Sequence, residues 1–142
     1  MCPYRSPALS LGQQILKMKR DFPDFHYTRH NNLPTWHGYL QPTSSSPNYR
    51  VKIIYQYDNY SSKAPRVWIL TPDIRNSAPH RYSDLSLCLY YPPDRSWTPF
   101  IFISETIVPW TSMWLAFYEL WLETDRWYGP EAYHNGQKGK RN

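Results

Sequence analysis

The run from Tyr49 to Tyr57 is the feature that most constrains how this chain can fold. Alternate residues of the run are apolar, so one face of a strand would carry Tyr49, Val51, Ile53, Tyr55 and Tyr57. Runs of similar composition lie on either side, at Phe25–Pro42 and Arg66–Thr71, and the first is broken near residues 30–34 into two strands. Only a turn (43–48) and a loop (58–65) join these runs, with no helix between them. The sequence therefore predicts a four-stranded antiparallel meander.

A helix is expected before this meander. Residues 8–22 have apolar side chains at helical spacing, with Ser10 as the cap and Pro23 as the stop: Leu11, Ile15, Met18 and Phe22. The polar side of this helix carries Gln14, Lys17 and Arg20, which we expect to face solvent or a partner.

A second helix is expected after the meander, over residues 104–124, with Pro109 in its first turn. Large side chains recur along it at helical spacing, namely Trp110, Trp114, Phe117 and Trp121, with Met113 and Leu120 beside them. We expect this stripe to pack against the sheet, and the alternative is a surface that stacks on a cofactor or on bases. Together with the meander, the two helices predict an α+β fold.

Charge and cysteine content narrow the class of protein. The formal net charge is +5, carried in part by Lys17, Lys19 and Arg20 and by a basic tail, which fits either nucleic acid or an acidic protein partner.

No run approaches the roughly 20 apolar residues of a membrane span, and no signal peptide is recognisable, so we expect a cytoplasmic location and no membrane partner. With only two cysteines and no zinc spacing, we expect no disulfide, no metal and no cofactor. We expect a single domain over residues 1–134 and a disordered tail over 135–142.

The stretch between Thr71 and Pro99 lacks periodicity and contains Cys88. Long irregular segments in compact domains often carry function, and apolar Leu85, Leu87 and Leu89 would anchor this one. A cysteine thiolate is a nucleophile, and acyl chemistry also needs a group that stabilises the oxyanion and one that accepts a proton. The candidates close in sequence are His80, Tyr82, Asp84, Ser86 and Tyr90. The alternative is a buried, unreactive cysteine.

The order of these features resembles the ubiquitin-conjugating enzymes. The matching motifs are a basic first helix, a Pro-x-Val strand, a loop led by a histidine, a Cys-Leu pair and a Trp-Thr-Pro, here Pro65-Arg66-Val67, His80, Cys88-Leu89 and Trp97-Thr98-Pro99. The segment from Glu105 to His134 is similar to a bacterial branch, the conjugating proteins of type II CBASS antiphage operons, which lie beside a cGAS-like nucleotidyltransferase.

The resemblance implies a thioester mechanism. Cys88 would accept the C-terminal carboxyl of a partner protein, in this branch the cGAS-like enzyme, and pass it to an amine. Lys17, Lys19 and Arg20 match the surface that meets the activating enzyme in the wider family. The chain has no Gly-rich nucleotide loop, so activation of the carboxyl is expected from another protein.

One motif departs from the family pattern. The family's His-Pro-Asn reads His80-Arg81-Tyr82, so the asparagine associated with the oxyanion is missing, and the spacing to the cysteine is about two residues shorter. Tyr82, Asp84 or His80 are the candidates to replace it in catalysis.

Three alternatives to a conjugating enzyme stay open. An inactive docking module of the same fold would bind the partner without chemistry. A single-stranded nucleic-acid binder would need exposed rings interleaved with Lys and Arg, whereas these rings fall at core spacings, so no nucleic acid is expected. A cysteine protease would need a histidine on a separate element, and the surroundings of His26, His30, His37 and His134 show no supporting pattern.

Overall fold

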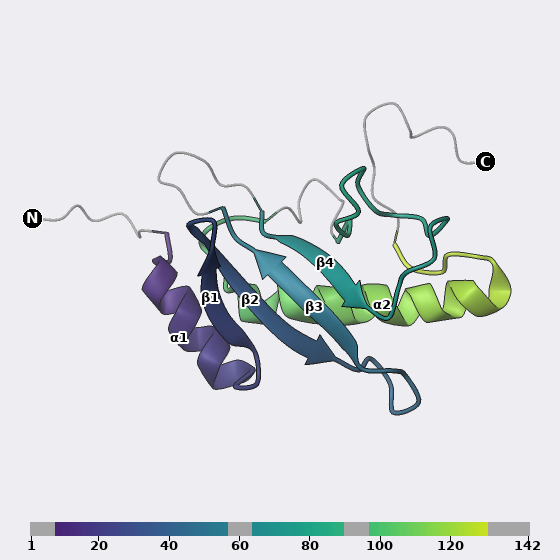
Figure 1. The fold of residues 1–142 in the computed structure, drawn as a ribbon, viewed down its shortest axis with the longest axis horizontal. Coiled ribbons are helices and arrows are strands. Elements are labelled where there is room, and N and C mark those ends of the chain that lie inside the picture. The colour runs from purple at the N-terminus through teal and green to yellow at the C-terminus, as the bar shows by residue number, and fades with distance from the viewer. Residues whose placement is uncertain (1–7, 57–63, 90–96, 131–142) are drawn as a thin grey trace, which may run out of the picture.

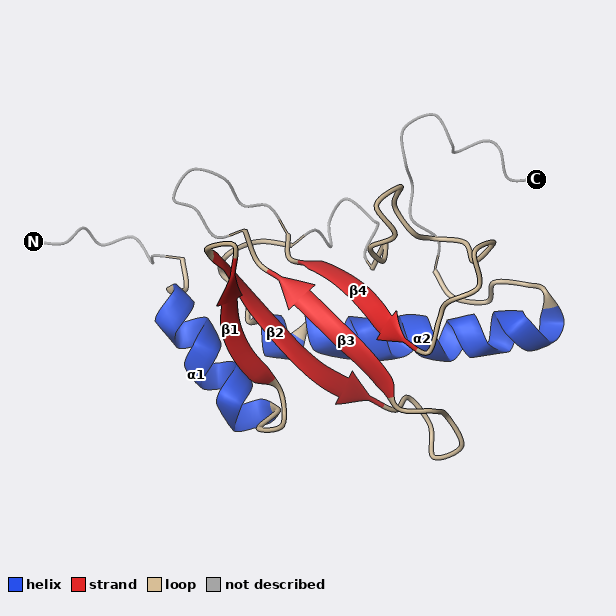
Figure 2. Cartoon of the chain, in the orientation of Figure 1, coloured by secondary structure: helices blue, strands red, loops and turns tan. Residues whose placement is uncertain are grey.

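A four-stranded antiparallel sheet forms the centre of the molecule, in the strand order β1-β2-β3-β4 (Figure 1). The computed structural model describes residues 8–56, 64–89 and 97–130. In chain order the elements are α1 (Leu11–Asp21), β1 (His26–His30), β2 (Leu33–Leu40), β3 (Tyr49–Ile54), β4 (Arg66–Thr71), the 3-10 turn η2 (Ile103–Glu105) and α2 (Ile107–Thr124). The α2 helix crosses behind the sheet and α1 lies beside β1 (Figure 2). The predicted α+β meander with flanking helices is confirmed.

Local sequence explains how the first hairpin forms. His30 pairs with Leu33, which leaves Asn31 and Asn32 as the two turn residues, and their φ angles are 51° and 68°. Asparagine tolerates this left-handed region, so the pair suits the tight turn that the twist of a hairpin favours. The β2 strand consequently begins at Leu33, which lies inside the break that the sequence predicted near residues 30–34.

The β3 strand is central and places the core on one face of the sheet. Its alternate residues Tyr49, Val51 and Ile53 are buried, as predicted, and Tyr55 continues this face beyond the strand. Tyr57, which we expected to extend the face, lies outside the described residues. On β2, Gly38 leaves room for the ring of Phe25, whose nearest atom would lie 2.2 Å from an added Cβ. The sheet therefore packs closely at this point because residue 38 has no side chain.

The α1 helix begins and ends as its sequence predicts, but one of its polar residues is buried. Ser10 caps it with a capping box that includes Gln13. Gln14, which we expected on the solvent-facing side, is only 1% exposed. Its amide donates to the carbonyl of Ile101 (3.0 Å) and accepts from the N–H of Ile103 (2.9 Å). Gln14 thus satisfies two main-chain groups of the segment before α2, which accounts for a polar side chain in the core.

The α2 helix packs its aromatic stripe on the sheet only in part. Trp114 and Trp121 are buried, whereas Met113 (52% exposed) and Leu120 (37% exposed) are not. The buried face of the helix is Ile107, Val108, Thr111, Trp114, Leu115, Tyr118 and Trp121. Trp110 and Phe117 of the stripe are partly buried, and Met113 and Leu120 beside it are exposed because the helix is apolar on more than one side, and only the sheet selects which side is covered. Within the described residues no helix is both long and apolar enough to cross a bilayer.

Candidate active site around Cys88

A tight hairpin positions Cys88 at the open edge of β4. Arg81 and Leu87 form an isolated antiparallel bridge, and the N–H of Cys88 donates to the carbonyl of His80 over 3.0 Å. The tip closes with a hydrogen bond from the N–H of Tyr82 to the carbonyl of Ser86 (2.9 Å). The N–H of Leu87 donates to the carbonyl of Val67 (2.9 Å), which fixes the hairpin to β4. Within the predicted functional loop, of which residues 72–89 and 97–99 are described, these main-chain hydrogen bonds hold residues 80–88 in place.

Asp84 holds the tip of this hairpin. Its Oδ1 accepts from the N–H (2.9 Å) and from the hydroxyl (2.6 Å) of Ser86, which is fully buried. Its Oδ2 lies 3.5 Å from a guanidinium nitrogen of Arg66, and this nitrogen also donates to Ser86 Oγ over 2.9 Å. These hydrogen bonds, that of the Ser86 hydroxyl foremost, keep the pKa of the Asp84 carboxyl below its ordinary value. The carboxylate is therefore ionised and engaged in holding the turn.

Two tryptophans fasten the hairpin to the body of the protein. Trp68 of β4 donates its indole N–H to the carbonyl of Asp84 (2.9 Å). Trp114 of α2 donates its indole N–H to the carbonyl of His80 (3.1 Å), the same carbonyl that binds the N–H of Cys88. The His80 ring lies 4.9 Å from that of Trp127, centroid to centroid. His80 itself has a φ of 60°, so the chain turns sharply just where it begins the hairpin.

The Cys88 thiol is buried, and two opposing effects act on its pKa. The residue is 6% exposed, and this burial raises the pKa of the thiol because the thiolate loses hydration. A hydrogen bond with the Tyr82 side chain acts in the other direction and lowers it. The Tyr82 ring is 37% exposed and stacks against the guanidinium of Arg66, 4.8 Å from the ring centroid. Tyr82 therefore links the thiol to a cationic, solvent-facing edge.

The predicted catalytic residues thus come from one hairpin but make different contacts. Tyr82 reaches the thiol through its side chain, His80 meets Cys88 through its main chain, and Asp84 binds Ser86. Trp97 packs in the core, 5% exposed, edge-on to Tyr55. Tyr90 and Cys2 lie outside the described residues.

Sequence reasoning missed three residues that build this site, Arg66, Trp68 and Trp114. Arg66 and Trp68 are on β4, about twenty residues before the cysteine, and Trp114 was assigned to the core alone. The run Arg66–Thr71 was predicted as a strand and the Pro-x-Val motif includes Arg66, but neither signal indicated that this strand borders the cysteine.

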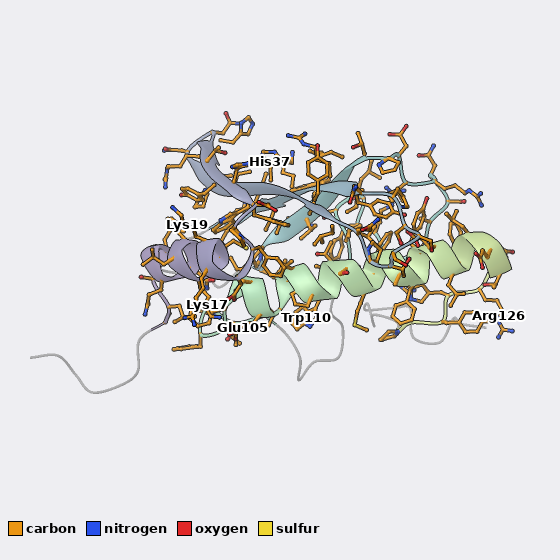
Figure 3. All side chains as sticks on the ribbon, turned by 90° about the horizontal axis from the view of Figure 1, so that it is seen from below. Lys17, Lys19, His37, Glu105, Trp110 and Arg126 are labelled. Atoms are coloured by element: carbon orange, nitrogen blue, oxygen red, sulfur yellow. The ribbon has the colours of Figure 1, made fainter. Side chains whose placement is uncertain are left out.

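The three basic residues of α1 are not equivalent, and two of them, Lys17 and Lys19, are labelled in Figure 3. The Lys17 ammonium binds Asp21 (2.7 Å) and Glu105 (3.0 Å), and Asp21 also accepts from the hydroxyl of Ser104 (2.7 Å). Lys17 therefore ties α1 to η2, while Lys19 and Arg20 are exposed. The pKa of Lys17 is raised, mainly by the hydrogen bond with Asp21.

The described histidines away from the hairpin lie on the first two strands. His26, His30 and His37 belong to β1 and β2, and no cluster of three metal-binding side chains occurs among the described residues. His134 lies outside them.

Comparison with known protein families covers both the fold and the Cys88 hairpin. A model of the type II CBASS E2 protein family matches residues 14–135, which include the sheet, the Cys88 hairpin and α2. Comparison with curated proteins gave no match. Because the family model covers most of the sequence, the chain belongs to the type II CBASS E2 proteins, the conjugating-enzyme-like family of this antiphage defence system.

Proposed function

We propose that the protein carries the C-terminus of a partner protein as a thioester on Cys88 and transfers it to an amine on a target. The observation that carries this proposal is the hydrogen bond between the Tyr82 side chain and the Cys88 thiol, in a chain of the CBASS E2 family. A hydroxyl that donates to sulfur stabilises the thiolate, which is the reactive form. The partner proposed is the cGAS-like nucleotidyltransferase that accompanies such proteins.

The chemistry is an acyl exchange in two steps. The partner arrives with its C-terminal carboxyl already activated, as an adenylate or thioester made by a separate activating enzyme. The Cys88 thiolate attacks the carbonyl carbon, a carbon–sulfur bond forms, and the activating group leaves with the electron pair. An amine of the target then attacks the same carbon and loses a proton to solvent, the carbon–sulfur bond breaks, and the thiolate is regenerated.

Tyr82 is the proposed replacement for the missing asparagine. Its side chain lowers the pKa of the Cys88 thiol through a hydrogen bond, and we propose that the same hydroxyl donates to the oxyanion that develops on the acyl oxygen. Asp84 and His80 act as positioning residues in this scheme. Asp84 fixes the hairpin tip through Ser86, and the His80 carbonyl holds the N–H of Cys88.

The partner-binding role predicted for the basic helix falls on Lys19 and Arg20. Both side chains are exposed on α1, and the described ion pairs with Asp21 and Glu105 are made by Lys17. We propose that they contact the activating enzyme, with Lys17 supporting the helix beneath them.

A docking module without chemistry is the second candidate. Burial favours it, since a thiol that is 6% exposed with a raised pKa is unreactive in the resting state. In that case the fold would bind the partner's C-terminus and Cys88 would be a small core residue.

Non-reducing gels separate the two candidates. The wild type, Cys88→Ser and Cys88→Ala are each co-expressed with the nucleotidyltransferase encoded beside the gene. Thioester chemistry predicts a heavier band that thiols remove in the wild type, that resists thiols in Cys88→Ser as an oxygen ester, and that is absent in Cys88→Ala. Binding of the partner by all three variants with identical gels would refute the thioester and leave the docking module.

A further inference from the structure

The face of the sheet opposite α2 carries rings and cations in register. The backbone pairing puts His26, His37, Lys52 and Trp68 side by side on one rung across all four strands, and Tyr39 and Arg50 on the next rung. These residues alternate with the buried Trp36, Val51 and Val67, so they point to the other face. Figure 3 shows His37 on the side of the sheet away from α2, and in Figure 1 neither described helix covers this face.

The side chains of these two rungs reach solvent. Tyr39 is 60% exposed, His26 is exposed, and His37, Arg50, Lys52 and Trp68 are partly exposed. The rung on the other side differs, because Thr35 is fully buried there. The accessible part of the face is therefore the region around Tyr39, Arg50 and Lys52, which we call the ring–cation face.

The charge of the ring–cation face is of one sign. No residue of β1, β2, β3 or β4 is Asp or Glu. Of the carboxylates that flank these strands, Asp84 is bound to Ser86 and Arg66 at the β4 edge, whereas Asp24 and Asp73 lie two residues before His26 and two residues after Thr71. The pKa of His37 is lowered, first by burial and then by the positive charges of Arg50, Lys52 and His30. An anionic ligand would relieve this concentration of positive charge.

The rings favour one kind of anion over others. Lys52 holds its ammonium over the Trp68 ring, 5.0 Å from the centroid, so this cation is kept at the surface beside an aromatic face. Tyr39 lies directly opposite Arg50, and its exposed ring is free to stack. Single-stranded nucleic acids bind surfaces of this kind, with phosphates on Lys and Arg and bases on aromatic rings. An acidic protein segment would use the cations but gain little from the rings.

We propose that the ring–cation face binds single-stranded nucleic acid, with Tyr39 stacking on a base and Arg50 and Lys52 contacting phosphates. The sequence led us to expect no nucleic acid because the rings of residues 104–124 fall at core spacings. The binding surface inferred here uses different rings, which only the pairing of the strands brings together. It does not depend on the chemistry of Cys88.

Fluorescence anisotropy with labelled oligothymidylate and oligouridylate of about twelve nucleotides tests this inference. We expect binding by the whole chain that weakens between about 50 and 200 mM salt, with Arg50→Ala lowering the slope of log K against log salt by about 0.7. Tyr39→Ala should weaken binding roughly 5- to 150-fold, and Tyr39→Phe should leave it unchanged because the ring remains. Since Tyr39 is exposed, neither change should disturb folding.

Two controls make the result decisive. Lys19→Ala removes an exposed cation from α1, outside the ring–cation face, and should leave the affinity close to that of the wild type. Cys88→Ser should bind as the wild type does, so failure of the thioester proposal would not affect this assay. The inference is overturned if no oligonucleotide binds at low salt, or if Tyr39→Ala and Lys19→Ala bind as Arg50→Ala does. It is also overturned if a polyglutamate peptide binds as tightly and is insensitive to Tyr39→Ala, which would identify an acidic protein site.

Discussion

Single residues decide how reactive the thiol of Cys88 can be. Burial opposes the thiolate and Tyr82 favours it, and both effects come from the same few atoms at the end of the hairpin. The Tyr82 hydroxyl is therefore the group whose removal should change the pKa of the Cys88 thiol most directly.

The Tyr82→Phe substitution should make Cys88 less reactive. It keeps the ring that stacks with Arg66 and removes the hydroxyl that bonds the thiol, so the pKa of the thiol should rise further. A typical hydrogen bond contributes about 0.5–1.5 kcal/mol, so alkylation by iodoacetamide at a fixed, mildly alkaline pH should slow several-fold. Tyr128→Phe, a change at an exposed ring elsewhere, is the matched control and should not alter the rate. Equal rates in the wild type and Tyr82→Phe would mean that the hydroxyl does not act on the sulfur.

At the scale of elements, side-chain hydrogen bonds connect helices and strands that are distant in sequence. Gln14 satisfies the main chain at residues 101–103, and Glu119 of α2 accepts from the hydroxyls of Tyr49 (2.7 Å) and Ser46 (2.8 Å). Asp21 and Lys17 similarly join α1 to η2, since Asp21 accepts from the hydroxyl of Ser104 and Lys17 binds Glu105. Each of these bonds fixes the relative position of two elements that are distant in sequence.

The junction between α1 and η2 should weaken in acid. The hydrogen bond from Lys17, followed by that from Ser104, holds the pKa of Asp21 below its ordinary value in the folded state. Its contribution to the free energy of unfolding is therefore fully present above the unfolded-state pKa near 4, and is lost as the pH falls through the lower folded-state pKa. Asp21→Asn removes the titrating group, so it should be less stable than the wild type at neutral pH.

Urea denaturation at a series of pH values checks this expectation. The difference in midpoint between the wild type and Asp21→Asn should shrink as the pH is lowered below about 4. Asp24→Asn, a change at an exposed neighbouring carboxyl, controls for a general effect of charge. A difference that stays constant into acid would show that the ionised Asp21 does not stabilise the junction.

At the scale of the whole molecule, the proposed activities use different residues, although the ring–cation face adjoins the Cys88 hairpin where Trp68, beside Lys52, donates to the carbonyl of Asp84. The Cys88 hairpin lies at the β4 edge, the exposed cations Lys19 and Arg20 are on α1 beside β1, and the ring–cation face lies on the sheet opposite α2 (Figure 1). The basic residues behind the net charge of +5 are thus distributed over different parts of the surface, for which we propose different partners.

Charge reversal on α1 should affect only one of these activities. The Lys19→Glu, Arg20→Glu double variant should lower the yield of the thioester on Cys88 several-fold, because charges at the rim of an interface mainly set the rate of association. The same variant should retain most of its oligonucleotide affinity. Lys52→Glu is the matched control and should show the reverse pattern. The gels and the anisotropy assay described above measure both, and a parallel loss of both activities in either variant would mean that the surfaces are not independent.

The sequence by itself determined the elements and their order. The alternation at residues 49–55, the capping residues of α1 and the turn residues Asn31 and Asn32 act over a few residues, so they could be interpreted without knowledge of the fold. The motif order around Cys88 likewise indicated the family that the comparison then matched.

Only the tertiary structure decided which faces are covered and which side chains meet. Gln14 is buried, and Met113 is exposed although it belongs to the apolar helix, because each depends on a neighbour far away in the chain. The contact of Trp114 with the His80 carbonyl joins residues 34 positions apart, and the rung His26–His37–Lys52–Trp68 exists only through the register of four strands. Periodicity reports that a face is apolar or polar, whereas packing determines what lies against it.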